Sequence, residues 1–231
     1  MSGSGSRIIV ALDPPDDVNV VDWCLSIIGE TRDLVAGYKI GLPLLVRLDS
    51  INELSLLARA MGDGLLRIVD LKLADIGDVM VSSIKPFIHY GFNYFIAHSF
   101  IGCRDGLGVL NSFLRENNAW LITVVSMSHR GSVEVMDSIV DRLLEVSVNV
   151  GAWGVVAPAT RPEIIRFVRK HIGSRARILS PGIGPQGARP GDALMAGADY
   201  EIIGRMITRN SGPRHVVKEI NKIHESLLGE G

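Results

Sequence analysis

Three charged residues, Asp70, Lys72 and Asp75, close a stretch that otherwise has the apolar character of a buried strand, GLLRIVDLKLAD. Successive strand side chains point to opposite faces, so Asp70 and Lys72 are expected to share a face. They could form an ion pair that merely closes the strand, although buried ion pairs contribute little net stability because desolvation offsets their attraction. Clustered charges at a cleft are also typical of a functional site.

The elements that must position these charges follow a regular alternation. Short apolar runs, each followed by a stretch with helical spacing, occupy residues 7–13, 34–41, 67–73, 92–100, 120–128, 153–159, 177–183 and 199–205. After the second run, the helical spacing extends over 43–61. Near-continuous apolar strands joined by short connections are typical of a parallel sheet that is buried on both faces. The pattern predicts an α/β fold, a (β/α)8 TIM barrel forming a single domain over 1–231, with a flexible N-terminus at 1–6. An open doubly wound sheet is the alternative.

Active sites of such barrels lie at the carboxyl ends of the strands, where polar residues end the apolar runs. These residues are Asp13, Lys39, Asp70, Lys72, Asp75, His98, Ser128 and Arg205. We expect Lys39 and Asp75 to lie near Asp70 and Lys72, and four alternating charges exceed what one structural pair needs. Two of the other residues have simpler interpretations, because Asp13 could cap the following helix and His98 could be a hydrogen-bonded histidine at a strand end.

A glycine-rich segment, SPGIGPQGARPG, follows the seventh run, and the eighth ends in Gly204 and Arg205. Glycine lets backbone N–H groups approach an anion closely, and a guanidinium can hold a phosphate with two hydrogen bonds. Barrel enzymes commonly bind phosphate with the loops after strands seven and eight. The segment therefore predicts a phosphate site, the alternative being a flexible turn beside a surface arginine.

Composition narrows the possible partners. The chain has 24 basic and 25 acidic residues, which gives no electrostatic reason to expect nucleic acid or a membrane surface. No apolar run approaches the ~20 residues that a membrane span needs. Cys24 and Cys103 do not form a CxxC pair and do not have metal-ligand spacing with histidine, so we expect reduced thiols in a cytoplasmic protein and no metal.

Over almost its whole length, from IIVALD to IIGR, the chain resembles the orotidine 5′-monophosphate decarboxylases in their short archaeal form. The most specific match is D-x-K-x-x-D-I, here Asp70, Lys72, Asp75 and Ile76. Supporting matches are ALD with Asp13, YKIG with Lys39, His98 in the fourth strand, MSH with Ser128, PQG with Gln186, and GR with Arg205.

The resemblance implies decarboxylation of orotidine 5′-monophosphate to UMP without metal or cofactor. Lys72 would donate a proton to C6 of the pyrimidine and Asp70 would stand near the departing carboxylate. Asp75 and Ile76 would reach into the site of a second subunit, which implies a homodimer. The catalytic set implied is Lys72, Asp70, Asp75 and Lys39, and the substrate-binding set is Asp13, Lys39, Ile76, His98, Ser128, Pro181, Gln186, Gly204 and Arg205.

One position departs from the family pattern. Val79 stands where the family commonly has a threonine that reaches the partner's ribose, and valine cannot donate that hydrogen bond. Related enzymes that act on 3-keto-gulonate 6-phosphate or hexulose 6-phosphate share D-x-K-x-x-D, often followed by a small residue and glycine. Those enzymes hold Mg²⁺ partly with a glutamate where this chain has Lys39, which would repel the ion. A barrel that binds a phosphate ligand without catalysis is a third hypothesis.

Overall fold

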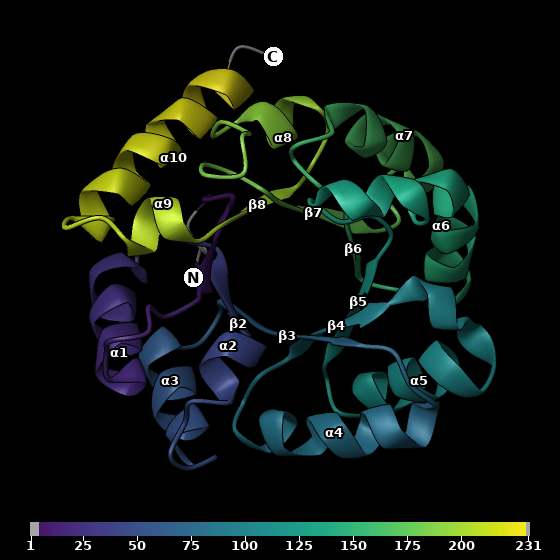
Figure 1. The fold of residues 1–231 in the computed structure, drawn as a ribbon, viewed down its shortest axis with the longest axis horizontal. Coiled ribbons are helices and arrows are strands. Elements are labelled where there is room, and N and C mark those ends of the chain that lie inside the picture. Colours follow the sequence, from purple (N-terminus) through teal and green to yellow (C-terminus); the bar gives the residue numbers. More distant parts are fainter. Residues whose placement is uncertain (1–4, 230–231) are drawn as a thin grey trace.

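The structure is a computed structural model that describes residues 5–229. Eight parallel strands pair in sequence order and close into a barrel, β8 pairing with β1 (Figure 1). The strands are β1 Ile8–Leu12, β2 Gly37–Gly41, β3 Leu66–Leu73, β4 Tyr94–His98, β5 Trp120–Val124, β6 Gly154–Val156, β7 Arg177–Pro181 and β8 Tyr200–Ile203. The predicted (β/α)8 barrel is confirmed.

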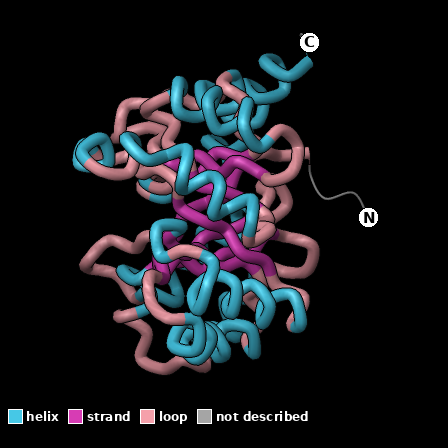
Figure 2. The backbone as a smooth tube through the Cα atoms, turned by 90° about the vertical axis from the view of Figure 1, so that its right-hand side faces the viewer, coloured by secondary structure: helices cyan, strands magenta, loops and turns pink. Residues whose placement is uncertain are grey.

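Helices surround the strands on the outside of the ring, as Figures 1 and 2 show. They are α1 Val20–Thr31, α2 Leu42–Leu45, α3 Glu53–Met61, α4 Gly77–His89, α5 Gly108–Glu116, α6 Val140–Asn149, α7 Pro162–Ile172, α8 Asp192–Met195, α9 Arg205–Thr208 and α10 Pro213–Gly229. Shorter helical turns lie at Ser99–Ile101, Cys103–Leu107, Arg130–Glu134 and Asp137–Ile139. No helix within 5–229 is long and apolar enough to cross a membrane.

The prediction of one continuous helical stretch over 43–61 is wrong, because α2 ends at Leu45 and α3 begins at Glu53. Polar side chains bond to the backbone between them: the Ser50 hydroxyl accepts from the Asn52 amide at 3.2 Å, and the Glu53 carboxylate accepts from the Asp49 amide at 3.0 Å. Such local bonds compete with helix formation. Of the predicted flexible segment 1–6, residues 1–4 lie outside the described residues, and the Ser6 hydroxyl donates to Asn221 at 2.9 Å.

The strand side chains form two apolar layers. One packs outward against the helices, and the other fills the barrel interior with Ile9, Ala11, Ile68, Ile96, Ile122, Val124, Val156, Leu179 and Ile202. At the amino ends of the strands the interior is closed by aromatic rings, because Trp153 lies between Tyr94 and Tyr200 with centroid distances of 4.7 and 6.3 Å. The barrel is therefore a packed core whose polar residues collect at the opposite, carboxyl end.

A buried carboxylate on the outer face of β8 fixes the loop that follows β7. Glu201 is fully buried and accepts hydrogen bonds from the amides of Gly191, at 3.0 Å, and Ala193, at 3.2 Å. Its other neighbour is Nε2 of His224 in α10, 2.9 Å away. Glu201 thus anchors the far end of the glycine-rich segment to both β8 and α10.

Candidate active site

The carboxylate of Asp70 in β3 lies between two ammonium groups. Lys72 Nζ is 2.9 and 2.8 Å from its two oxygens, and Lys39 Nζ, from neighbouring β2, is 3.3 Å from Oδ2. Asp13, at the end of β1, adds a second carboxylate 3.9 Å from Lys39. Only 9% of the Asp70 side chain and 11% of the Lys39 side chain are exposed. Three adjacent strands therefore present four alternating charges at one edge of the barrel.

The neighbouring charges determine the ionisation of this cluster. Burial by itself raises the pKa of Asp70, but the ammonium groups of Lys39 and Lys72 outweigh that effect and the pKa is lowered. Asp70 is consequently ionised at neutral pH and neutralises two cations held close together. Burial, followed by the charge of Lys72, lowers the pKa of His98, so its ring is uncharged at neutral pH.

The backbone at Lys72 departs from a regular strand. The pairing of β3 with β4 shifts register between Asp70 and Leu73, and Lys72 adopts a positive φ of 46°. Residues other than glycine, asparagine and aspartate rarely adopt this conformation, and it costs of order 1–3 kcal/mol. The alternation of side chains along a regular strand, from which Asp70 and Lys72 were predicted to share a face, therefore does not apply here. This local irregularity in β3, and not regular strand geometry, brings the ammonium to the carboxylate.

A cavity of about 260 Å³ lies over the barrel interior beside this cluster. Among its lining residues are nine of the predicted ones: Asp13, Lys39, Asp70, Lys72, Ser128, Pro181, Gln186, Gly204 and Arg205. Its apolar lining, which sequence reasoning missed, includes Ile96, Val124, Met127, Val156 and Ile202. Charges from β1–β3 thus face the same space as the glycine-rich segment and Arg205, which forms no ion pair among residues 5–229.

Three predicted site residues are not among the residues that line this cavity. Asp75 is exposed, and its carboxylate accepts from the adjacent Ile76 amide at 2.7 Å, with no ion pair to Lys39 or Lys72 among the described residues. The Ile76 side chain is itself 62% exposed. The His98 ring lies 4.8 Å from that of Phe100 at a tilt of 34°, and its buried Nδ1 has no hydrogen-bond partner in the described chain. Within one chain, the fourth charge of the cluster is therefore Asp13, whereas Asp75 was predicted in that place.

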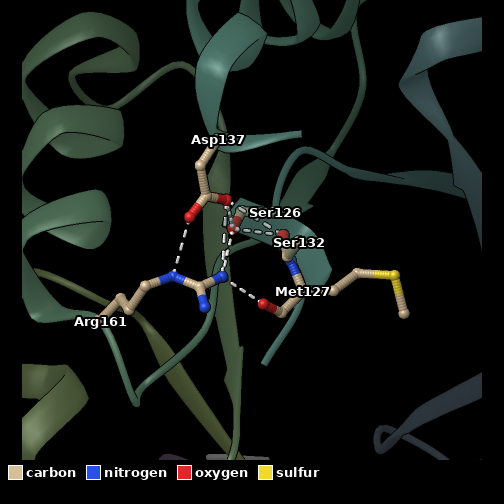
Figure 3. A network of polar contacts seen from close by, with 5 residues as sticks. All are labelled: Ser126, Met127, Ser132, Asp137 and Arg161. Atoms are coloured by element: carbon tan, nitrogen blue, oxygen red, sulfur yellow. Dashed lines mark hydrogen bonds and ion pairs between the residues drawn. The ribbon is translucent and has the colours of Figure 1, made fainter. Parts of the chain in front are cut away.

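A polar network that sequence reasoning missed supports the loop after β5 (Figure 3). Arg161 Nε lies 3.0 Å from Asp137, and the same guanidinium donates to the Ser126 hydroxyl at 2.9 Å and to the Met127 carbonyl. Ser132 donates to Asp137 at 3.0 Å and accepts from the Met127 amide at 3.0 Å. The network fixes the backbone just before Ser128. No local signal marks it, since Ser126, Asp137 and Arg161 come from three separate segments.

Packing explains the glycine that follows the D-x-K-x-x-D-I motif. A Cβ built on Gly77 at the start of α4 would lie 2.4 Å from Cβ of Val109 in α5. No side chain fits at that distance, so the close contact of two helices requires glycine here. The DIG sequence is therefore explained without reference to the chemistry of the site.

Replacing Asp70 by asparagine is expected to destabilise the protein at pH 7, because Lys39 and Lys72 would lose their shared counter-charge. The pKa of Asp70 is lowered on folding, so its contribution is complete above the unfolded pKa of about 4 and disappears as the pH falls through the folded value. The difference in unfolding free energy between wild type and Asp70→Asn, measured by urea denaturation, should narrow below about pH 4. If this difference in unfolding free energy stayed constant from pH 7 to pH 3, the predicted contribution of the Asp70 charge would be contradicted. Asp17→Asn, at an exposed position, is the control.

A family model and the similar proteins of known sequence name the same enzyme family. Residues 6–220 match the model of the orotidine 5′-phosphate decarboxylase / HUMPS family. An orotidine 5′-phosphate decarboxylase of Aeropyrum pernix is 47% identical over 208 residues, covering 90% of this chain and 84% of the relative. Its counterpart from Pyrococcus abyssi is 37% identical, covering 96% of this chain and all of the relative.

Solved structures give the same result. The orotidine 5′-monophosphate decarboxylase of Sulfolobus solfataricus superposes with a TM-score of 0.84 at 36% identity, covering 96% of this chain and 99% of that one. The Methanocaldococcus jannaschii protein, crystallised with the inhibitor BMP, superposes with a TM-score of 0.83 at 27% identity, covering 94% and 98%. Similarity thus extends over the barrel and the loops that form the cavity.

Proposed function

Since the chain belongs to the orotidine 5′-phosphate decarboxylase / HUMPS family, we propose that it decarboxylates orotidine 5′-monophosphate to UMP and carbon dioxide in pyrimidine biosynthesis, without a metal or cofactor. The observation that carries the proposal is the buried Asp70 carboxylate held between Lys72 and Lys39 at the wall of a cavity that Arg205 also lines. Its curated relatives are decarboxylases of this kind by name.

The chemistry requires a cation at the reacting carbon. When the bond from C6 to the carboxylate breaks, carbon dioxide leaves and the electron pair stays on C6, where no cofactor can delocalise it. The Lys72 ammonium stabilises that developing charge and then gives C6 a proton. Asp70, whose carboxylate lies 2.8 Å from the Lys72 ammonium, holds that ammonium at the wall of the cavity before the reaction. The strained backbone at Lys72 is consistent with a side chain positioned for chemistry.

The remaining lining residues are assigned to the rest of the nucleotide. Asp13 and Lys39 hold the ribose hydroxyls, Ser128 contacts the pyrimidine, and Gln186 bridges base and phosphate. Gly204 and Arg205 bind the phosphate, supported by the glycine-rich segment that Glu201 anchors. Binding energy from the phosphate, far from C6, orients the ring for the reaction. Pro181, within this segment, also lines the cavity. His98 remains assigned to the substrate, and it is close enough to Lys72 and Asp70 for their charges to affect its pKa.

We further propose that the active unit is a homodimer in which Asp75 and Ile76 serve the partner's site. Asp75 is exposed, and among the described residues its carboxylate forms no ion pair with Lys39 or Lys72 of its own chain. Large apolar side chains are exposed in the neighbouring segments, namely Leu42, Val46, Ile76, Val79 and Phe100. These side chains follow the adjacent strands β2, β3 and β4, and apolar surface that gathers in one region is typical of a protein interface. With Val79 in place of the family threonine, contact to the partner's ribose falls to another residue of this segment, such as Ser82 or Ser83.

We also propose a cytoplasmic location and a single barrel domain. Cys24 and Cys103 are both free, which is usual in a reducing compartment. The Cys24 thiol is unreactive, because burial raises its pKa to about 12.

The family description also covers enzymes other than orotidine 5′-monophosphate decarboxylases, and their magnesium-dependent sugar-phosphate chemistry is the rival function. Lys39 disfavours it, because its ammonium occupies the position where those enzymes place a metal-binding glutamate. Gly77 follows the shared motif as a glycine often does in those enzymes, but its close contact with Val109 explains it without their chemistry.

Turnover of orotidine 5′-monophosphate in excess EDTA tests the proposal directly. We expect decarboxylation, measured as the loss of substrate absorbance, to proceed at the same rate with and without the chelator. Loss of activity in EDTA that Mg²⁺ restores would favour the metal-dependent rival. Binding of UMP with no turnover at all would favour a barrel that only binds phosphate ligands.

A further inference from the structure

The loop that follows β1, residues 14–18, leads away from Asp13 and makes few hydrogen bonds of its own. Pro14 and Pro15 have no amide hydrogen, so they cannot donate to a neighbouring element. Asp16 and Asp17 are exposed to solvent. The ion pair between Asp13 and Lys39 is long, at 3.9 Å, and the Asp13 side chain is nearly half exposed. These contacts do not by themselves fix the Asp13 carboxylate.

The loop is held instead by one side chain from the next strand–helix connection. Arg47, just after α2, donates from Nη1 to the carbonyls of Pro15 at 2.7 Å and Pro14 at 3.4 Å. Its Nη2 donates to the carbonyls of Asp16 at 3.0 Å and Val18 at 2.9 Å. Among the described residues, no other side chain from outside residues 14–18 hydrogen-bonds to this loop.

Four carbonyl oxygens that converge on one point repel each other unless a cation lies between them. The guanidinium is suited to this position because its donors spread in a planar fork, whereas a lysine ammonium is a single point charge. The break between α2 and α3 is what places Arg47 in a turn rather than on a continuous helix.

Arg47 therefore connects two neighbouring parts of the site. Ala11 of β1 pairs with Lys39 in the middle of β2, so Asp13, two residues beyond Ala11, lies one step above Lys39 on the neighbouring strand. The loop after β1 begins at Asp13, and α2 follows directly from the strand that carries Lys39. The bonds from Arg47 fix the first connection against the second.

We propose that Arg47 is a positioning residue that sets the Asp13 carboxylate for the ribose hydroxyls of the nucleotide, an inference that rests on the proposed function. It contacts neither the cavity nor the reacting carbon, and it acts through the backbone of residues 14–18. Its loss weakens nucleotide binding more than it slows the chemical step, because Lys72 and Asp70 keep their geometry.

The test is a double-mutant cycle on UMP binding, measured by calorimetry. Arg47→Met is expected to raise the Kd for UMP about tenfold and to raise KM with little change in kcat. In the Asp13→Ala background, the same substitution should change the Kd less than about twofold, because the group that Arg47 positions is absent. The preference for UMP over 2′-deoxy-UMP should shrink in Arg47→Met as it does in Asp13→Ala.

Arg169→Met is the matched control. Arg169 bonds to the carbonyls of Gly197, Gly173 and Ala176 at the amino ends of the strands, far from the cavity. Its loss should lower stability without changing the Kd for UMP. Arg47→Lys keeps the charge and most of the volume, and it should bind UMP as weakly as Arg47→Met. It replaces Arg47→Met in the test if the methionine variant does not fold.

The possible outcomes separate the inference from the proposed function. Additive effects of Arg47→Met and Asp13→Ala on the Kd, or an unchanged Kd in both Arg47 variants, would overturn the positioning role. Wild-type protein that binds UMP but does not decarboxylate orotidine 5′-monophosphate would overturn the proposed function alone. Wild-type protein that does not bind UMP would overturn both.

Discussion

Replacement of Lys72 by alanine is expected to reduce kcat for orotidine 5′-monophosphate by at least about 10⁴-fold. The substitution removes both the cation that stabilises the charge at C6 and the proton that C6 receives. Asp70 keeps a counter-ion in Lys39, 3.3 Å away, so the site should remain folded. UMP or 6-aza-UMP should therefore bind to Lys72→Ala with a Kd close to that of the wild type.

The control for this prediction is Lys170→Ala, which removes the same charge from an exposed position of α7. It should leave both kcat and the Kd for UMP unchanged. If Lys72→Ala kept full activity, the proposed mechanism would be wrong. If it lost UMP binding as well, its role would be to hold the nucleotide rather than to supply the proton.

Mixing two inactive variants is expected to restore activity if Asp75 serves the partner's site. Lys72→Ala and Asp75→Asn each inactivate a homodimer, but a mixed dimer contains one site with wild-type Lys72 and wild-type Asp75. Random pairing makes half of the dimers mixed, and each has one intact site of two, so about a quarter of wild-type activity should return. Turnover after co-refolding equal amounts of the two chains measures this.

The matched control pairs Lys72→Ala with Asp70→Asn. These residues lie 2.8 Å apart in one chain, so no mixed dimer contains a complete site and activity should not return. A Lys72→Ala and Asp75→Asn mixture that stays inactive, although the mixed dimer is detected, would place Asp75 in the site of its own chain.

The barrel was predictable because its signal is local and repeated. Eight apolar runs, each long enough for one buried strand, were followed by helical spacing, and all eight strands are present. What failed was the stretch 43–61, where apolar spacing continues across Asp49, Ser50 and Asn52. There, side-chain bonds to the backbone override the periodicity, and such bonds depend on a conformation that spacing does not reveal.

The site was predictable where a polar residue interrupts or follows an apolar run, and less so elsewhere. Asp13, Lys39, Ser128 and Arg205 were placed correctly at the cavity by their positions alone. Asp70 and Lys72 were also placed correctly, but for an incomplete reason, because the positive φ at Lys72 breaks the alternation. The inward positions Ile96, Val124, Val156 and Ile202 could have been found by that same alternation, because they lie in the regular strands β4, β5, β6 and β8.

Two features had no sequence signal. Arg161 and Asp137 are 24 residues apart and come together only when the loops after β5 and β6 fold. Arg47 looked like one charge on an amphipathic helix. Contacts between loops depend on the complete fold, so neither composition nor periodicity could predict them.

The aromatic closure of the barrel, with Trp153 between Tyr94 and Tyr200, determines how molecules move through the enzyme. With these rings and the packed interior blocking the amino end, the described structure has no passage along the barrel axis. Carbon dioxide released at Lys72 must therefore leave through the same mouth by which the nucleotide entered. Substrate and both products therefore share one opening, so any movement that narrows the mouth slows entry and exit together.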